Sequence, residues 1–356
     1  MEAIENGTAE SLRWLCFVLN PKMDMPKVTD WSAVYAFADK QKITGICSPS
    51  LYPMKVEQTL LFQWLGIEQQ IKERCYVLNK RIKELCHLLE EAGFRCCILK
   101  GQGNAEMYFD PLLRMPGDID VWVDSSEQSI QEYVRDLFPD AEKTRKHIKF
   151  PLFKDVPIDV HITPLKFYCP KYHKRLQRWI EDNKKYQFEH KIHLKGIDRE
   201  ISVPTAKFNA VYQLGHMLIH LFDEGIGLRH IVDYYYVLKN LTLTNEERAE
   251  SERTLASLGL LRFAKAVLWI EHDILGIPKD CVFLDPDEKH GRQLLEDILD
   301  GGNFGRYSQR YKGKNGFYWR GTIEAQRLLS MRYFSPCEAV FSLIRKMKSA
   351  VKHVVN

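Results

Sequence analysis

Asp118 and Asp120 stand two positions apart in the short stretch DIDVWV, residues 118–123. Charged and apolar residues alternate there with the period of two that is typical of a β-strand, so both carboxylates leave the same face. Two adjacent carboxylates repel each other and raise each other's pKa unless a cation neutralises them. The pair therefore predicts a site for a divalent ion, because magnesium prefers one or two carboxylates together with water and phosphate oxygens.

A third carboxylate occurs in a second stretch of similar character. Asp159 lies in PIDVHI, residues 157–162, which also has the pattern of a short strand. If the two strands are neighbours in one sheet, Asp159 faces the same way as the first pair and joins the metal site. An isolated pair of acids is common on exposed strands, and the second stretch is what favours a metal site. His161 shares the face of Asp159, either as a supporting residue of the site or as a structural histidine.

Phosphate groups bound near such a metal need hydrogen-bond donors, and the stretch before the acidic pair offers several. Gly101 and Gly103 flank a turn into a short helix, where backbone N–H groups could face a triphosphate. Lys100 and Arg114 would add positive charge, and Arg114 could donate two parallel hydrogen bonds. A solvated strand end is an equally good interpretation of Lys100, whereas the position of Arg114 before the acidic strand favours function.

Further polar residues recur at helical spacing nearer the C-terminus. His216 and His220 are four residues apart, which is metal-ligand spacing, but no third ligand in the required pattern lies nearby. We interpret them as polar residues on a helix beside the site. Arg229 and Asp233 have the same spacing and could simply pair on a helix.

The elements that must position these residues follow from the apolar pattern. Asp30 predicts the start of one helix, and a second helix runs from about residue 56 to residue 92, where Gly93 stops it. The apolar run FRCCILK, residues 94–100, predicts a buried strand, and the short piece GNAEMYF that follows predicts a helical turn.

A helix over residues 127–137 is predicted between the two acidic stretches, and the chain is helical again after about Pro204. The segment from Gly301 to Gly321 is predicted to be irregular. The fold class is therefore α+β with an α/β core, in which a small mixed sheet is flanked by helices. The predicted domains are an N-terminal helical region (1–92), a domain that carries the acidic residues (93–203) and a C-terminal helical domain (204–356).

Three motifs, taken in order, resemble a known family. They are ILKGQGNAEMYFDPLLRMPGDIDVWVD, PIDVHITP and GIGLRHIVDYYYVL. Together they resemble the uncharacterised bacterial nucleotidyltransferases, which are related to the polymerase-beta, kanamycin-type and minimal nucleotidyltransferases. The resemblance covers roughly residues 30 to 280.

The resemblance implies that a nucleoside monophosphate passes from an NTP to a hydroxyl, with release of pyrophosphate. Asp118 and Asp120 would bind two magnesium ions, with manganese as an alternative. Asp159 would ligate the catalytic ion and help to deprotonate the attacking hydroxyl. The resemblance also implies nucleotide binding by a set of glycine and basic residues: Lys100, Gly101, Gly103, Arg114 and Arg229.

The acceptor is not named by the sequence and can be a small molecule, a protein or RNA. The net charge of +4 neither demands nor excludes nucleic acid. Residues 306–320 interleave basic and aromatic residues as a groove for single strands would, but a loop with packed aromatics is favoured. The basic last helix is predicted to dock on the helical domain rather than on a membrane. The alternative function is a non-catalytic nucleotide- or RNA-binding regulatory module, similar to an antitoxin, on the same fold; three retained carboxylates argue against it.

The cysteines and the apolar segments predict a cytoplasmic protein. The nine cysteines include no CxxC pair and leave an odd residue, so we expect reduced core residues rather than disulfides or a zinc site. The first twenty residues lack the pattern of a secretory signal. The longest uncharged stretch, residues 208–222, is too short and too polar to cross a bilayer.

Overall fold

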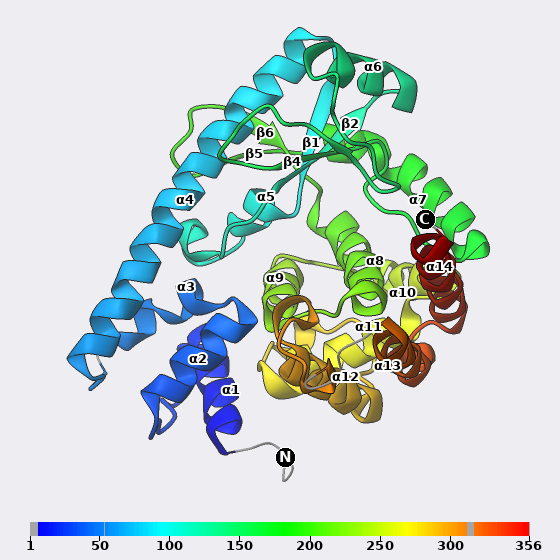
Figure 1. Ribbon diagram of the computed structural model, residues 1–356. Helices are drawn as coiled ribbons and strands as arrows, with labels where there is room; N and C mark the ends of the chain where they lie inside the picture. Colours follow the sequence, from blue (N-terminus) through cyan, green and yellow to red (C-terminus); the bar gives the residue numbers. More distant parts are fainter. Residues whose placement is uncertain (1–5, 53, 312–316, 356) are drawn as a thin grey trace. The chain divides into compact units, whose positions relative to one another are not determined.

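The computed structural model describes residues 6–52, 54–311 and 317–355 (Figure 1). It has the predicted α+β fold, with a small mixed sheet and many helices. The chain forms two compact units, each built from separate segments. The first comprises residues 1–42, 167–176 and 213–356, and the second comprises residues 43–166 and 177–212. The division into domains at residues 92 and 203 stays a prediction.

The first unit, here called the helical unit, is built from helices. It contains α1 (Asn6–Leu19), α2 (Trp31–Gln41), α9 (Leu228–Lys239), α10 (Asn245–Ser257), α11 (Leu261–Trp269), α12 (Glu288–Gly301), α13 (Phe317–Ser330) and α14 (Pro336–Val355). Two longer helices, α7 (Pro170–Glu189) and α8 (Ala206–Asp223), contribute residues to both units.

The second unit, here called the sheet unit, carries the strands. Its helices are α3 (Thr44–Cys47), α4 (Gln58–Glu91), α5 (Gly101–Ala105) and α6 (Glu127–Leu137). Its strands are β1 (Arg95–Leu99), β2 (Ile119–Asp124), β3 (Ile148–Lys149), β4 (Ile158–His161), β5 (Lys191–His193) and β6 (Glu200–Ser202). The last two strands form a separate antiparallel pair.

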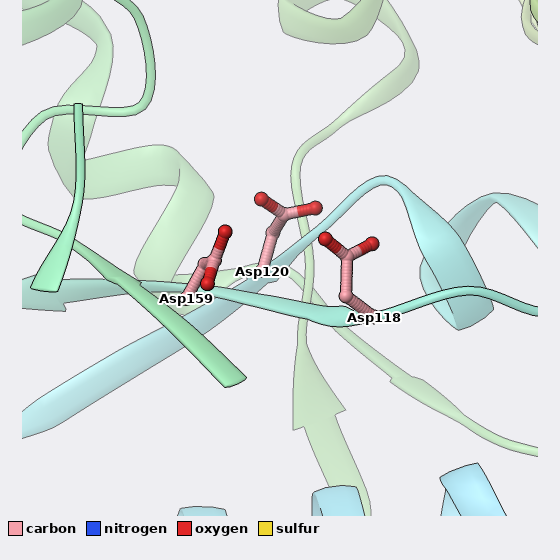
Figure 2. A group of neighbouring side chains, drawn as sticks. All are labelled: Asp118, Asp120 and Asp159. Atoms are coloured by element: carbon pink, nitrogen blue, oxygen red, sulfur yellow. The ribbon is translucent and has the colours of Figure 1, made fainter. Parts of the chain in front are cut away.

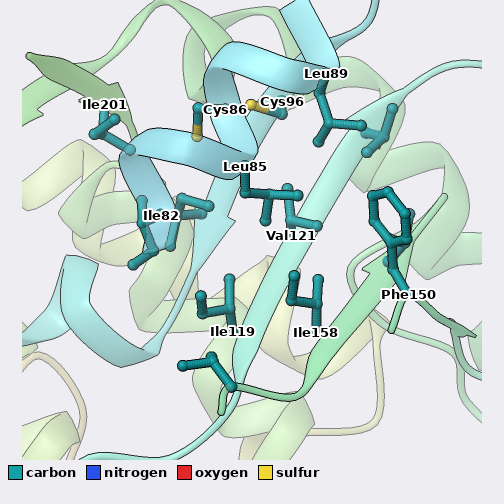
Figure 3. Packing of buried hydrophobic residues seen from close by; sticks show 14 of the residues in the cluster. Ile82, Leu85, Cys86, Leu89, Cys96, Ile119, Val121, Phe150, Ile158 and Ile201 are labelled. Carbon is teal, nitrogen blue, oxygen red and sulfur yellow. The ribbon is translucent and has the colours of Figure 1, made fainter. Parts of the chain in front are cut away.

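The four-stranded sheet has the order β1-β2-β4-β3. Strands β2 and β4 are parallel, and their partners at the two edges are antiparallel to them. On one face of this sheet, Ile119, Val121 and Ile158 enter a buried apolar cluster (Figure 3). Leu85 of α4 and Ile130 of α6 belong to the same cluster. Because side chains alternate along a strand, the residues between these apolar positions face the other way.

Most predicted elements are confirmed by the structure. The side chain of Asp30 accepts a hydrogen bond from the backbone of Ala33 at the start of α2, and α6 has the predicted bounds. Helix α4 ends at Glu91, and Gly93 adopts a positive φ of 83°. The short helical piece begins at Gly101, two residues earlier than predicted.

The prediction that residues 301–321 are irregular is wrong in part, because α13 already begins at Phe317. Gly321 lies inside this helix, and a Cβ atom there would meet nothing within 4 Å. An exposed helix tolerates a glycine at modest cost, so the residue does not end it as a sequence pattern suggests.

The prediction that all cysteines are reduced is also wrong. Cys169 and Cys337 form a disulfide, with Cα atoms 5.7 Å apart and a sequence separation of 168. The pairing arises from tertiary contacts inside the helical unit, where Glu338 accepts hydrogen bonds from the backbone N–H groups of Tyr168 and Cys169. Sequence spacing cannot reveal such a pair. The other cysteines in the described chain are free, and most are buried, as predicted.

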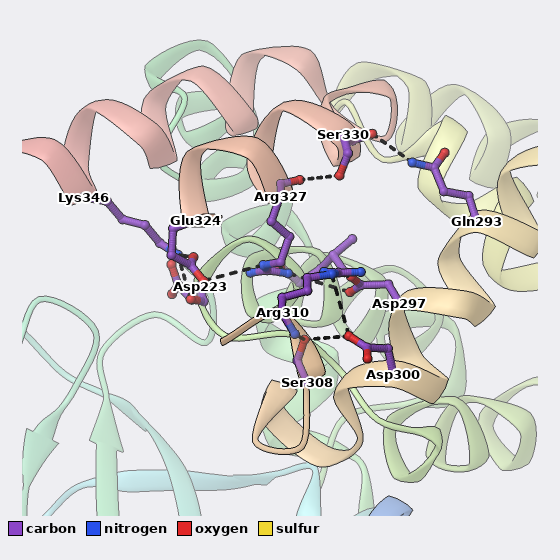
Figure 4. Close-up of polar contacts among 11 residues, drawn as sticks. Asp223, Gln293, Asp297, Asp300, Ser308, Arg310, Glu324, Arg327, Ser330 and Lys346 are labelled. Carbon is purple, nitrogen blue, oxygen red and sulfur yellow. Dashed lines mark hydrogen bonds and ion pairs between the residues drawn. The ribbon is translucent and has the colours of Figure 1, made fainter. Parts of the chain in front are cut away.

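The basic and aromatic stretch of residues 306–320 is described only in part, since residues 312–316 and the side chains of 311–320 lie outside the described chain. Within the helical unit, Arg310 forms an ion pair of 2.6 Å with Asp297, and Arg327 lies 3.7 Å from the same carboxylate (Figure 4). This end of the stretch therefore packs on acidic residues of α12.

Across the residues that are described, the helices are all too short or too polar to cross a membrane.

Candidate metal centre

Asp118, Asp120 and Asp159 converge on one side of the sheet (Figure 2). One oxygen from each carboxylate lies within 4.8 Å of the others. Asp120 and Asp159 are buried, with exposed fractions of 8% and 5%, whereas Asp118 is exposed just before β2 begins. The described chain contains no other cluster of three or more potential metal ligands among its His, Cys, Asp and Glu side chains.

The pairing of β2 with β4 explains this convergence. The two strands are parallel, and Asp120 is the direct partner of Asp159. Residues opposite each other in adjacent strands face the same side of the sheet, so both carboxylates leave the face opposite the apolar cluster. Asp118, two residues before Asp120, continues the same row.

Asp120 is held by two basic side chains. The ammonium group of Lys100 lies 3.0 Å from one carboxylate oxygen, and Nε2 of His161 donates to the other at 2.8 Å. Burial alone would raise the pKa of Asp120, but Lys100 and His161 outweigh it and hold the pKa well below its usual range. Asp120 is therefore ionised, and His161 is hydrogen-bonded to it.

Asp118 has the opposite electrostatic environment. Its pKa is raised, first by the negative charge of Asp120 and then by partial desolvation of the carboxyl group by neighbouring residues. Lys100 offsets part of this effect, and Asp159 adds to it. A cation bound among the three acids would remove the repulsion, because it favours the ionised form of each.

Asp159 contacts two basic residues that the sequence analysis missed. Nζ of Lys149 lies 2.7 Å from one carboxylate oxygen, and Nδ1 of His147 lies 3.2 Å from the other. Lys149 is the antiparallel strand partner of Asp159. Burial is the main reason why the pKa of His147 is lowered. The run KTRKHIK, residues 143–149, was the available signal, since such a density of basic residues beside a strand is unusual.

The turn after β1 places Lys100 at the site through an uncommon backbone conformation. Lys100 has a φ of 51° and Gly101 a φ of 45°, a region that a residue with a Cβ rarely adopts. Such conformations persist only where the surrounding structure enforces them. The helix that follows, α5, has only five residues. A Cβ at Gly103 would lie 3.0 Å from the side chain of Val203, so there is little room for a larger residue there; the role of Gly103 in nucleotide binding stays a prediction.

The two predicted arginine contacts are in different places. Arg114 belongs to the sheet unit and is 4% exposed; its guanidinium donates to the carbonyl of Met115 at 3.3 Å. Arg229 is half-buried in the first turn of α9, in the helical unit. Contact of either with a nucleotide stays a prediction. In the same unit, the Nε2 atoms of His216 and His220 lie 3.1 Å apart without a third ligand from the described residues.

The donor set fits a hard divalent cation. It consists of carboxylate oxygens alone, and magnesium and manganese prefer oxygen ligands. An ion would compete with the ammonium groups of Lys100 and Lys149 for the same carboxylates. The identity of the metal stays a prediction.

Comparison with known families decides the relationship of this chain. The profile described as uncharacterised nucleotidyltransferase matches residues 27–276, more than half of the chain. The chain belongs to this nucleotidyltransferase family. The three converging carboxylates lie within the matched residues, and the match spans roughly the region that the sequence motifs indicated.

No curated protein matches the chain. Among solved structures, it is similar to an antigenic nucleotidyltransferase-like protein from Paracoccidioides brasiliensis, at 14% sequence identity. The alignment covers 60% of this chain and 97% of that one, with a TM-score of 0.33.

Proposed function

We propose that this member of the nucleotidyltransferase family is an enzyme that transfers a nucleoside monophosphate from an NTP to a hydroxyl group. Pyrophosphate would leave, and ATP would be among the donors. The observation that carries the proposal is the meeting of three carboxylates on one face of the sheet. The same proposal includes three further points: the enzyme is related to the polymerase-beta type, it depends on magnesium, and it is located in the cytoplasm.

Each acidic residue would have its own task. Asp118 and Asp120 would hold both metal ions, and Asp159 would hold the ion beside the acceptor and take the proton of the attacking hydroxyl. Bound divalent ions supply charge neutralisation for the attacking and leaving oxygens. The hydrogen bond of 2.8 Å from His161 fixes the orientation of the Asp120 carboxylate. Lys100 would add positive charge near the phosphates.

Label transfer from an α-labelled NTP tests the proposal. With magnesium, wild-type protein and a cell extract, we expect a labelled acceptor to appear. The double change Asp118→Ala and Asp120→Ala should abolish both the transfer and magnesium-dependent binding of the nucleotide. The matched control is Asp124→Ala, at the end of the same strand, because Asp124 pairs with Arg95 and Lys184 instead of joining the triad.

Two outcomes would contradict the proposal. One is transfer that persists in the double variant while thermal unfolding shows a folded protein. The other is nucleotide binding by the wild type with no transfer, unchanged by the double substitution, which is the behaviour expected of a non-catalytic binding module.

A further inference from the structure

Residues 143–149, KTRKHIK, form a basic segment beside the metal centre, here called the basic arm. Its last two residues form β3, the edge strand next to β4. Two of its residues contact the acidic triad directly, since Lys149 and His147 both reach the carboxylate of Asp159. The arm is therefore part of the wall of the site.

Local hydrogen bonds give the arm a defined shape. The hydroxyl of Thr144 accepts from the backbone N–H groups of Lys146 and His147, and it donates to the carbonyl of His147. Nζ of Lys166 donates to the carbonyl of Arg145 at 3.0 Å. These bonds hold the backbone of the arm in a closed turn.

The side chains of the arm differ in exposure and in partners. Lys143 forms an ion pair of 2.6 Å with Glu127 on α6, so we assign it a structural role. Arg145 is exposed, and 44% of the Lys149 side chain is accessible although its ammonium group contacts Asp159. Arg145 and Lys149 can therefore meet a ligand from solvent.

Asp120 and Asp159 are contacted by basic side chains from opposite edges of the sheet. Lys100 approaches Asp120 from the turn after β1, whereas the basic arm approaches Asp159 from the opposite edge of the sheet. Under the proposed function, the triphosphate of the donor lies with Asp118 and Asp120, and the attacking hydroxyl lies with Asp159. The arm then borders the acceptor rather than the donor.

We propose that the acceptor carries a phosphate group, which Lys149 and Arg145 bind beside the attacking hydroxyl. With a divalent ion bound, the carboxylate of Asp159 would attract the ammonium group of Lys149 less strongly, and Lys149 would be repelled by the ion. A phosphate oxygen of the acceptor would then give Lys149 a partner of opposite charge. Cationic acceptors are disfavoured by the same groups. This inference rests on the proposed function and adds the chemical class of the acceptor.

The test uses the full chain and a cell extract that has been separated by anion exchange into a retained and an unretained fraction. Each fraction is incubated with magnesium, an α-labelled NTP and wild type, Lys149→Met or the control Lys191→Met. Lys191 is an exposed lysine on β5 of the same unit. Ultrafiltration and nuclease treatment of the retained fraction distinguish a small phosphate ester from a nucleic-acid end as the source of the phosphate.

We expect wild type to label the retained fraction. Lys149→Met should lower kcat/KM for that fraction by about tenfold or more, as loss of a charge-assisted hydrogen bond does. The KM for the NTP and the thermal unfolding should stay as in Lys191→Met, and Lys149→Arg should restore part of the transfer.

Transfer mainly to the unretained fraction would overturn this inference and leave the proposed function standing. Equal transfer by Lys149→Met and Lys191→Met would overturn it as well. If wild type labels neither fraction, the proposed function fails, and the assignment of the acceptor fails with it.

Discussion

Aspartates gather in two places in this protein, and their partners differ. In the helical unit, buried Asp297 faces guanidinium groups, with Arg310 at 2.6 Å and Arg327 at 3.7 Å. In the sheet unit, Asp118 and two further aspartates bring their oxygens within 4.8 Å of one another. In the helical unit, basic groups enclose a single buried acid, whereas in the sheet unit three acids face one another although Lys100 and Lys149 contact two of them.

The contrast separates structural charges from functional ones. A buried acid that is enclosed by arginines maintains packing, and removal of either partner leaves an uncompensated charge. Acids that repel one another instead reduce the stability of the fold, and a cation is what relieves them. The raised pKa of Asp118, caused first by the charge of Asp120, is the local sign of that repulsion.

The largest effect is expected for Asp159→Asn. We expect label transfer to fall by about 10³-fold, because under the proposed function the substitution removes a charge that binds the metal and the group that accepts the hydroxyl proton. Magnesium-dependent NTP binding should change only a few-fold, since Asp118 and Asp120 are intact. Steady-state transfer and nucleotide titration measure the two quantities. The control is Asp155→Asn, an exposed acid that pairs with Arg81; an equal loss in this control would refute the assignment.

Asp297→Ala should affect stability rather than metal binding. It removes the nearest carboxylate of Arg310 and one of the two carboxylates beside buried Arg327, so the free energy of unfolding should drop by about 2 kcal/mol. Denaturant unfolding measures the loss, and magnesium titration should match wild type within about twofold. A variant as stable as wild type would show that the two clusters do not differ as we describe.

His161→Phe should weaken metal binding by about tenfold, which is the usual cost of losing a hydrogen bond to a metal ligand. Without Nε2 of His161, the Asp120 carboxylate loses its contact of 2.8 Å. Manganese titration, monitored by electron paramagnetic resonance, reports the affinity. His193→Phe is the control, because His193 is exposed on β5. Unchanged affinity would assign His161 a role in packing alone.

The smallest effect is expected for Asp118→Asn without metal. Because the folded-state pKa of Asp118 is raised, its ionisation costs stability above that pKa and costs nothing at low pH, where the carboxyl is protonated in both states. The variant should therefore be more stable than wild type at neutral pH, by a few tenths of a kcal/mol. The gain should vanish as the pH falls below the ordinary pKa of aspartate.

Asp124→Asn, on the same strand, should have the opposite effect on stability at neutral pH. Burial opposes its ionisation, but Lys184 and Arg95 outweigh burial and lower the pKa of Asp124. This variant should lose stability at neutral pH, and the loss should fade as the pH falls through the folded-state pKa. Thermal unfolding in the presence of a chelator compares the two variants. The same sign in both would contradict the proposed repulsion.

Much of the fold could be predicted because it is encoded locally. Helix α6 begins after a serine cap, and the alternation around Asp120 marks a strand. The convergence with Asp159 needed one further condition, that β2 and β4 are neighbours, which the parallel pairing satisfies. The similarity of the two acidic stretches in sequence suggested that their strands are neighbours.

The rest depends on contacts that no short pattern contains. Lys149 reaches Asp159 only because β3 adds to the sheet edge, and a strand of two residues leaves no periodic signal. Cys169 forms a disulfide with Cys337 at a sequence separation of 168. The glycine at 103 fits against Val203, which is visible only in three dimensions.

The direct pairing of Asp120 with Asp159 also limits how such a chain can change length. An insertion of one residue within β2 or β4 would turn one carboxylate into the apolar cluster. An insertion in the connection between α6 and β3 would leave the alignment of the strands untouched. Relatives of different length can therefore keep the same chemistry, provided that their extra residues fall outside these two strands.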